Sequence, residues 1–177
     1  MRVMLSLVLS LAPFAALAAG TGDSTAPTPT ETTTKCTGAQ VWDEAKQACV
    51  DAQSGALDDD TLFDAARELA WAGRPQDALT VLSAMREGET DRVLTYLGFA
   101  HRKSGDLEAG LAAYDRALAQ NPDNLLARSY FGQALVEMNE IELASAQLAE
   151  IRARGGAGSW AETSLSQAIR TGQTYNY

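Results

Sequence analysis

The sequence has 177 residues, enough for one compact domain with short additional segments. It carries 14 Lys and Arg against 23 Asp and Glu, a formal net charge of −9. Because this acidity repels phosphate backbones, we expect no nucleic-acid partner.

The N-terminal residues have the pattern of a secretory signal peptide. Met1 and Arg2 give a positive start, an apolar run follows, and Ala16-Leu17-Ala18 offers small residues for cleavage. The run is shorter than the roughly 18 to 20 residues that span a bilayer, which argues against an uncleaved anchor. We expect cleavage of residues 1–18 and export, to the periplasm of a Gram-negative bacterium or by secretion, with no stable membrane insertion afterwards. Loss of Arg2 leaves 13 Lys and Arg against 23 Asp and Glu, a net charge near −10.

Residues 19–35 are rich in Thr, contain Pro27 and Pro29 and lack large apolar side chains. Such a composition buries too little apolar surface to offset the entropy of ordering. The sequence therefore predicts a disordered Thr/Pro-rich linker here.

Two cysteines, Cys36 and Cys49, follow the linker. In an exported chain an even count indicates a disulfide rather than metal ligands or a nucleophile. Residues 36–50 would then form a small closed hairpin, with Trp42 covering the disulfide and docking on the first helix. The segment also resembles half of a peritrophin-type chitin-binding module, which uses more cysteines. Glycan or cell-wall binding through the hairpin is therefore an alternative function.

From Asp59 onward apolar residues recur every three or four positions, which predicts helices. Breaking and capping residues divide this region into seven helices without a convincing strand. Predicted N-caps are Asp58, Thr90, Asp106 and Ser159, with Asn139 and Glu142 resembling a capping box. Predicted helix ends are Gly73, Gly88, Gly105, Asn121 and Gly155. Pro75 suits the first turn of the second helix.

An internal repeat organises these helices. Leu97-Gly98 recurs as Phe131-Gly132 thirty-four residues later, and Tyr114 recurs as Leu148. A first unit matches the central unit at a spacing of 32 residues, so that Leu82 corresponds to Tyr114. We expect Gly98 and Gly132 at the closest approach of paired helices, and Tyr114 in the gap between repeats.

The central unit resembles the tetratricopeptide repeat (TPR) pattern through Leu94, Leu97, Gly98, His101, Gly110, Tyr114, Ala117 and Pro122. The resemblance implies an all-α, TPR-type α-solenoid of three helix pairs, residues 59–90, 91–124 and 125–158. A capping helix, residues 159–171, and a tail, residues 172–177, would follow. We expect Trp160 to pack the capping helix onto the third repeat. We expect the tail to fold back onto that helix; the alternative is that it is displayed to a partner or a protease.

The resemblance also implies a function. In TPR arrays the first helix of each pair lines a concave groove that binds peptides or helices of a partner protein. The groove positions transfer to Arg67, Trp71, Tyr96, Phe99, Arg102, Lys103, Tyr130, Gln133 and Glu137. The alternative is that several of these aromatic residues only pack against adjacent helices, since buried and groove-facing positions differ by one residue on a helix. The family's clamp for a terminal carboxylate is absent, because its positions hold Phe63, Asp64, Thr95, Tyr96, Ser129 and Tyr130. We expect a partner with apolar anchors and some acidity; its identity is not encoded here.

Nothing in the residue inventory predicts catalysis. His101 is the single histidine, and no second histidine or free cysteine completes a triad or metal site. Asp58 to Asp60 lack calcium-loop spacing, and the glycines from Gly155 to Gly158 lack the Lys of a phosphate loop. We expect no enzymatic activity, no cofactor and no bound metal.

Overall fold

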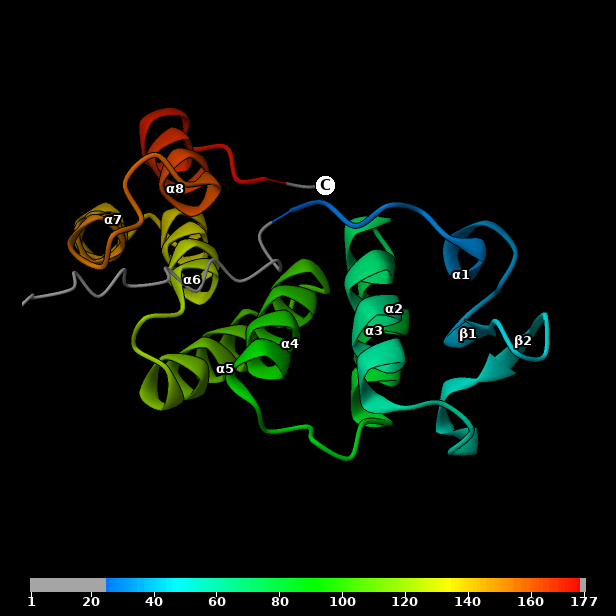
Figure 1. Cartoon of the computed structure of the whole chain (residues 1–177). Helices are drawn as coiled ribbons and strands as arrows, with labels where there is room; N and C mark the ends of the chain where they lie inside the picture. Colours follow the sequence, from blue (N-terminus) through cyan, green and yellow to red (C-terminus); the bar gives the residue numbers. More distant parts are fainter. Residues whose placement is uncertain (1–24, 176–177) are drawn as a thin grey trace, which may run out of the picture.

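The computed structural model describes residues 25–175 (Figure 1). The predicted signal peptide, residues 1–18, lies outside them. Two short strands and nine helical segments occur among these residues. In chain order they are α1 (Glu31–Thr34), β1 (Gln40–Asp43), β2 (Ala48–Asp51), the 3₁₀ turn η2 (Ala52–Ser54), α2 (Asp59–Trp71), α3 (Pro75–Ser83), α4 (Asp91–Lys103), α5 (Leu107–Gln120), α6 (Leu125–Glu137), α7 (Ile141–Ala153) and α8 (Trp160–Thr171).

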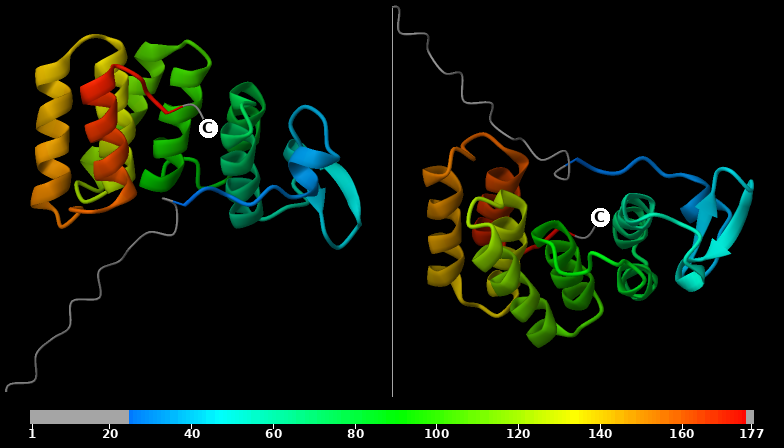
Figure 2. Two further views of the ribbon diagram at one scale, coloured as in Figure 1. Left: turned by 90° about the horizontal axis from the view of Figure 1, so that it is seen from above. Right: turned by 60° about the horizontal axis from the view of Figure 1, so that its bottom comes forward.

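The seven helices from α2 to α8 stack as antiparallel pairs, α2 with α3, α4 with α5 and α6 with α7, and α8 closes the stack (Figures 1 and 2). Successive pairs meet along an inner row, in which α2 contacts α4, α4 contacts α6 and α6 contacts α8. The second helices, α3, α5 and α7, form the outer row. This arrangement confirms the predicted all-α, TPR-type solenoid of three pairs plus a capping helix.

Side-chain caps set several helix starts where the sequence predicts them. Asp58 accepts from Thr61 N, Asp106 from Ala109 N and Ser159 from Glu162 N. The expected capping box at Asn139 is wrong. Asn139 adopts a left-handed backbone, φ 63°, directly after α6, and α7 begins without a side-chain cap. Asn tolerates this conformation, so it ends one helix instead of starting the next.

Two glycines allow helices to approach closely. A Cβ on Gly98 would lie 2.4 Å from the ring of Tyr114 in the paired helix α5, as expected. Tyr114 in turn stacks on Phe131 of the next repeat, with ring centroids 6.1 Å apart. A Cβ on Gly132 would instead meet Leu165 of α8 at 2.5 Å. The expectation for Gly132 is therefore corrected: it makes room for the capping helix and not for its paired helix α7.

The predicted disulfide joins Cys36 to Cys49 and closes the antiparallel hairpin of β1 and β2. Val41 of β1 is buried in the main hydrophobic core. Side chains alternate along a strand, so Trp42 lies on the other face, half-buried, with Lys35 Nζ 4.7 Å from its ring centroid. Val41, not Trp42, thus docks on the solenoid.

The end of the predicted linker is ordered. Thr30 caps α1, and Thr30 and Thr33 donate hydrogen bonds from both their backbone N–H and hydroxyl groups to the buried carboxylate of Glu68 in α2. Arg74 binds the carbonyl oxygens of Cys36 and Gly38 at 3.3 and 2.7 Å. Composition reflects only the apolar surface that a segment can bury, and this segment is held by hydrogen bonds instead.

Candidate peptide-binding face

The nine residues predicted to line a groove come together on the inner row of helices, here called the inner face. Arg67 Nε donates to Tyr96 OH at 3.3 Å, which links α2 to α4. Arg102 pairs with Glu137 at 3.0 Å, which links α4 to α6. The indole N–H of Trp71 also reaches Tyr96 OH, at 3.4 Å. The structure therefore groups these residues, and their role in binding stays a prediction.

An aromatic row runs along the inner face. Phe63 and Tyr96 meet edge to face at 5.6 Å between ring centroids, and Phe99 and Tyr130 lie 4.8 Å apart. Tyr130 then contacts Trp160 of α8 at 6.0 Å. Such aromatic pairs stabilise by about 0.5–1.5 kcal/mol beyond the apolar area they bury.

The row also joins the two ends of the inner face. The rings of Trp71, the last residue of α2, and Trp160, the first residue of α8, lie 6.3 Å apart. The sequence predicts for Trp160 only packing of the capping helix on the third repeat. A further step of the 34-residue period, from Arg92 to Leu126 to Trp160, would have placed Trp160 on the inner face.

Four cations of the inner face lie over aromatic rings. Arg92 lies 4.7 Å and Arg67 6.0 Å from the centroid of Phe63. Arg102 and Lys103 lie 5.6 and 5.7 Å from Phe99. Burial, followed by the charge of Arg102, lowers the pKa of Lys103 to about 8, although Glu137 opposes this shift. The three arginines are also paired with carboxylates, Arg67 with Asp64, Arg92 with Asp60 and Arg102 with Glu137, so the inner face carries charges of both signs.

The inner face is not an empty groove. Tyr96, Phe99, Arg102, Tyr130 and Gln133 are buried, whereas Arg67, Trp71, Lys103 and Glu137 keep partial exposure. Segments of the same chain contact it: Thr25 O accepts from Arg67 Nη2 at 3.1 Å. Tyr175 N donates to Gln133 Oε1 at 3.0 Å. Segments of the same chain therefore partly cover the inner face.

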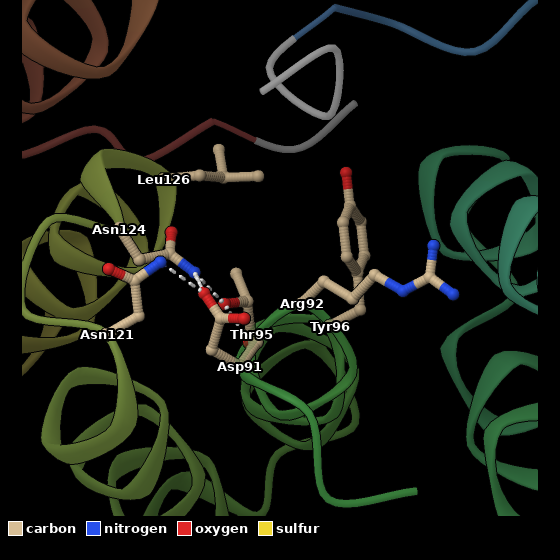
Figure 3. Close-up of a pocket in the computed structure, with 7 residues that line it drawn as sticks. All are labelled: Asp91, Arg92, Thr95, Tyr96, Asn121, Asn124 and Leu126. Atoms are coloured by element: carbon tan, nitrogen blue, oxygen red, sulfur yellow. Dashed lines mark hydrogen bonds between the residues drawn. The ribbon is translucent and has the colours of Figure 1, made fainter. Parts of the chain in front are cut away.

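A pocket of about 190 Å³ lies beside this face, between the N-terminal turns of α4 and α6 (Figure 3). Its lining consists of Asp91, Arg92, Thr95, Tyr96, Asn121, Asn124 and Leu126. Asp91 Oδ2 accepts from Asn121 and Asn124 at 2.7 and 3.0 Å, and Asn124 also donates to Thr95. These bonds satisfy the polar groups internally, so this pocket ties two repeats together.

The positions of the missing carboxylate clamp serve internal packing as well. Thr95 bonds to the backbone oxygen of Asp91, and Ser129 bonds to Ser164 of α8 at 2.9 Å. Tyr96 and Tyr130 belong to the aromatic row. The geometry is that of a packed inner face, with no basic pair to hold a carboxylate at these positions.

Other polar clusters have structural roles. The single histidine, His101, lies 3.7 Å from Asp106, the N-cap of α5. Asp59 accepts from the backbone N–H groups of Glu87 and Arg86, which holds the pKa of its carboxyl below the usual value. Within residues 25–175 no group of His, Cys, Asp and Glu is arranged to hold a metal ion. In the same range no helix is long and apolar enough to cross a membrane.

Comparison with known proteins agrees with this architecture. Residues 101–160, from the end of α4 to the first residue of α8, match a family described as tetratricopeptide repeat. Searches of curated proteins and of solved structures found no match to the chain. TPR repeats in general mediate protein–protein interactions. The family match and the pairing of helices together identify α2 to α8 as a TPR-type α-solenoid.

Proposed function

We propose that this protein is an exported interaction module of the cell envelope that binds a peptide or helix of a partner protein on its inner face. The observation that carries the proposal is the set of aromatic and basic side chains that the inner face leaves partly exposed, namely Arg67, Trp71, Lys103 and Trp160. Trp, Tyr and Arg dominate the energetics of protein interfaces, because they combine large contact area with polar tips. A binding face of this composition suits a partner segment with apolar anchors and acidic residues.

Two observations support export. The first is the signal-like pattern of residues 1–18, and the second is the disulfide between Cys36 and Cys49, a bond typical of oxidising compartments. Fractionation of cells with mass measurement of the purified protein tests this part. We expect a periplasmic product that begins after Ala18 and contains no free thiol. A full-length cytoplasmic product with two free thiols would refute export.

Charge reversal at the partly exposed residues of the inner face tests partner binding. Tyr96, Phe99 and Arg102 are buried, so their replacement would confuse folding with binding. We therefore choose Arg67→Glu with Lys103→Glu, and expect loss of partner crosslinking in intact cells with unchanged helicity. Arg116→Glu with Arg152→Glu, the same number of charge reversals on the outer helices α5 and α7, is the matched control and should crosslink normally. Equal crosslinking by all three proteins would exclude the inner face.

The alternative, glycan or cell-wall binding by the hairpin, rests on one observation. Trp42 lies half-buried on the hairpin face opposite Val41, and an aromatic ring in that position can stack on a sugar. Co-sedimentation with purified peptidoglycan or chitin tests the alternative. If it is correct, Trp42→Ala should abolish sedimentation, whereas Lys46→Ala at the hairpin turn should retain it. Absence of sedimentation by the unaltered protein would end this hypothesis.

A further inference from the structure

The chain after α8 turns back across the inner face. Gly172 adopts the left-handed conformation, φ 71°, and its N–H bonds to Ala168 O, so the helix ends with a sharp change of direction. The following residues, Gln173 to Tyr175, here called the tail segment, run from α8 towards α2 (Figures 1 and 2). A short segment thus returns to the surface on which we propose that a partner binds.

The tail segment makes contacts of the kinds that proteins use to recognise extended peptides. Tyr175 N–H donates to Gln133 Oε1 at 3.0 Å, and the Thr174 hydroxyl donates to the carboxylate of Glu137. The Tyr175 ring lies 5.8 Å from that of Trp160. Its hydroxyl donates to Gln167 Oε1 at 2.6 Å. One backbone bond, two hydroxyl bonds and one aromatic contact therefore define the position of two consecutive residues.

The receiving residues are held in place by the solenoid itself. Gln133 is fully buried, and its Nε2 donates to Ser129 Oγ, which directs the opposite oxygen to the tail segment. Glu137 is fixed by Arg102, whose side chain is 1% exposed. A buried amide oxygen at an inner-helix position is costly unless it accepts a hydrogen bond. In the structure Tyr175 N–H supplies that bond.

We propose that Gln133, Glu137, Trp160 and Gln167 form a subsite for an extended segment with a hydroxyl residue followed by tyrosine. The tail segment occupies this subsite within the same chain, and a partner segment of the same chemistry displaces it. The inference rests on the proposed function, since it names the chemistry of the partner segment and the competitor it meets.

The tail segment competes with an added peptide for the subsite, and its covalent attachment to α8 determines how strongly it competes. A segment tethered by a few residues has an effective concentration in the millimolar range, so weak contacts suffice to keep it bound. An added peptide must compete with the tail segment, so its apparent affinity equals its intrinsic affinity multiplied by the fraction of subsites that are open. We expect at least about a tenfold increase in affinity for such a peptide when the tail segment is removed.

A peptide with the chain's own sequence from Gly172 to Tyr177 is the probe. Fluorescently labelled, it is titrated into the full chain and into a chain truncated after Gly172, with binding measured by anisotropy. We expect binding to the truncated chain and at least tenfold weaker binding to the full chain. A peptide with Tyr175→Ala should bind neither. In the truncated chain, Gln167→Ala should weaken binding, whereas Gln76→Ala on the outer helix α3 should not.

A second variant covers the outcome in which truncation unfolds the protein. The full-length Thr174→Ala, Tyr175→Ala chain keeps its length and should take up the peptide as the truncated chain does. Absence of binding to folded chains without a functional tail segment, or equal binding to these and to the unaltered chain, would overturn the inference. This assay needs no cellular partner. Peptide binding combined with unaltered crosslinking of the Arg67→Glu, Lys103→Glu protein would refute the proposed function and leave the subsite intact.

Discussion

The two ends of the solenoid are covered by different means. At the C-terminal end, α8 places Ala161, Leu165 and Ala168 against the third pair as an ordinary amphipathic helix. At the N-terminal end, a disulfide-closed hairpin and α1 cover the first pair through Val41 and hydrogen bonds to Glu68 and Arg74.

Both devices meet one physical requirement, because a terminal repeat exposes an apolar face that the next repeat would otherwise cover. The C-terminal cap relies on apolar burial and the N-terminal cap on a covalent link and polar bonds. Apolar burial leaves a helical period in the sequence, whereas polar docking leaves none. We therefore expect loss of apolar contacts to destabilise the C-terminal cap, and loss of the disulfide or of hydrogen bonds to destabilise the N-terminal cap.

Substitutions in the C-terminal cap, α8, should lower the free energy of unfolding the most. Leu165 is fully buried and packs against Gly132, so Leu165→Ala leaves a cavity and should lower the free energy of unfolding by about 2–5 kcal/mol. Urea denaturation followed by circular dichroism measures it. Leu143→Ala on α7, where the side chain is 54% exposed, is the control and should change stability by less than about 0.5 kcal/mol. Similar values for the two variants would contradict the assigned role of α8.

Removal of the disulfide in the N-terminal cap should cause the second-largest loss of stability. Replacing both cysteines by serine releases a loop closed over 13 residues and should cost up to about 3 kcal/mol. The loss should be local, because the bridge precedes α2. Amide hydrogen exchange should therefore accelerate at Val41 and Val50 while α8 keeps its protection. Equal loss of protection at both ends would show that the N-terminal cap is not a separate unit.

The polar part of the N-terminal cap should contribute less. Glu68→Ala removes the acceptor of four donors and should cost about 1–3 kcal/mol, with faster amide exchange at Thr30 and Thr33. Glu68→Gln keeps one acceptor oxygen and should lose less. Asp64→Ala, on the same helix but with its carboxylate 75% exposed, is the control and should have little effect. Unchanged exchange at both threonines in Glu68→Ala would disprove this docking.

The smallest effect should come from the contact between the two ends. The pair Trp71 and Trp160 joins α2 to α8, and a double-mutant cycle with alanine should give a coupling of about 0.5–1.5 kcal/mol. A matched cycle between Trp42 and Trp160, for which the structure records no contact, should give none. Zero coupling for the first pair would mean that the ends of the inner face act independently in solution.

Much of the fold could be predicted because neighbouring residues determine where each helix begins and which of its faces is apolar. Every helix from α2 to α8 was expected from apolar spacing, and the starts at Asp58, Asp106 and Ser159 followed from cap chemistry. The end of α3 was placed too late, at Gly88, whereas the helix ends at Ser83. The nine inner-face residues follow from the resemblance to the TPR pattern. Which of them are buried depends on the helices and terminal segments that pack against them, and the helical period alone leaves this open.

The sequence by itself thus determined the helix pairs, their register, the disulfide and the members of the inner face. The helix pairs and their register follow from periodicities that act within about one turn of helix and from repetition of one unit. The disulfide follows from an even cysteine count after a signal-like segment, and the inner face from the resemblance to the TPR pattern. Only the tertiary structure decided that Trp71 meets Trp160, that Thr30 and Thr33 reach Glu68, and that Tyr175 returns to Gln133. Each of these contacts joins residues far apart in the chain. Whether such a contact forms depends on the curvature of the whole stack. That curvature is the sum of many small contributions from the packing of successive helices, so no short segment of the sequence indicates it.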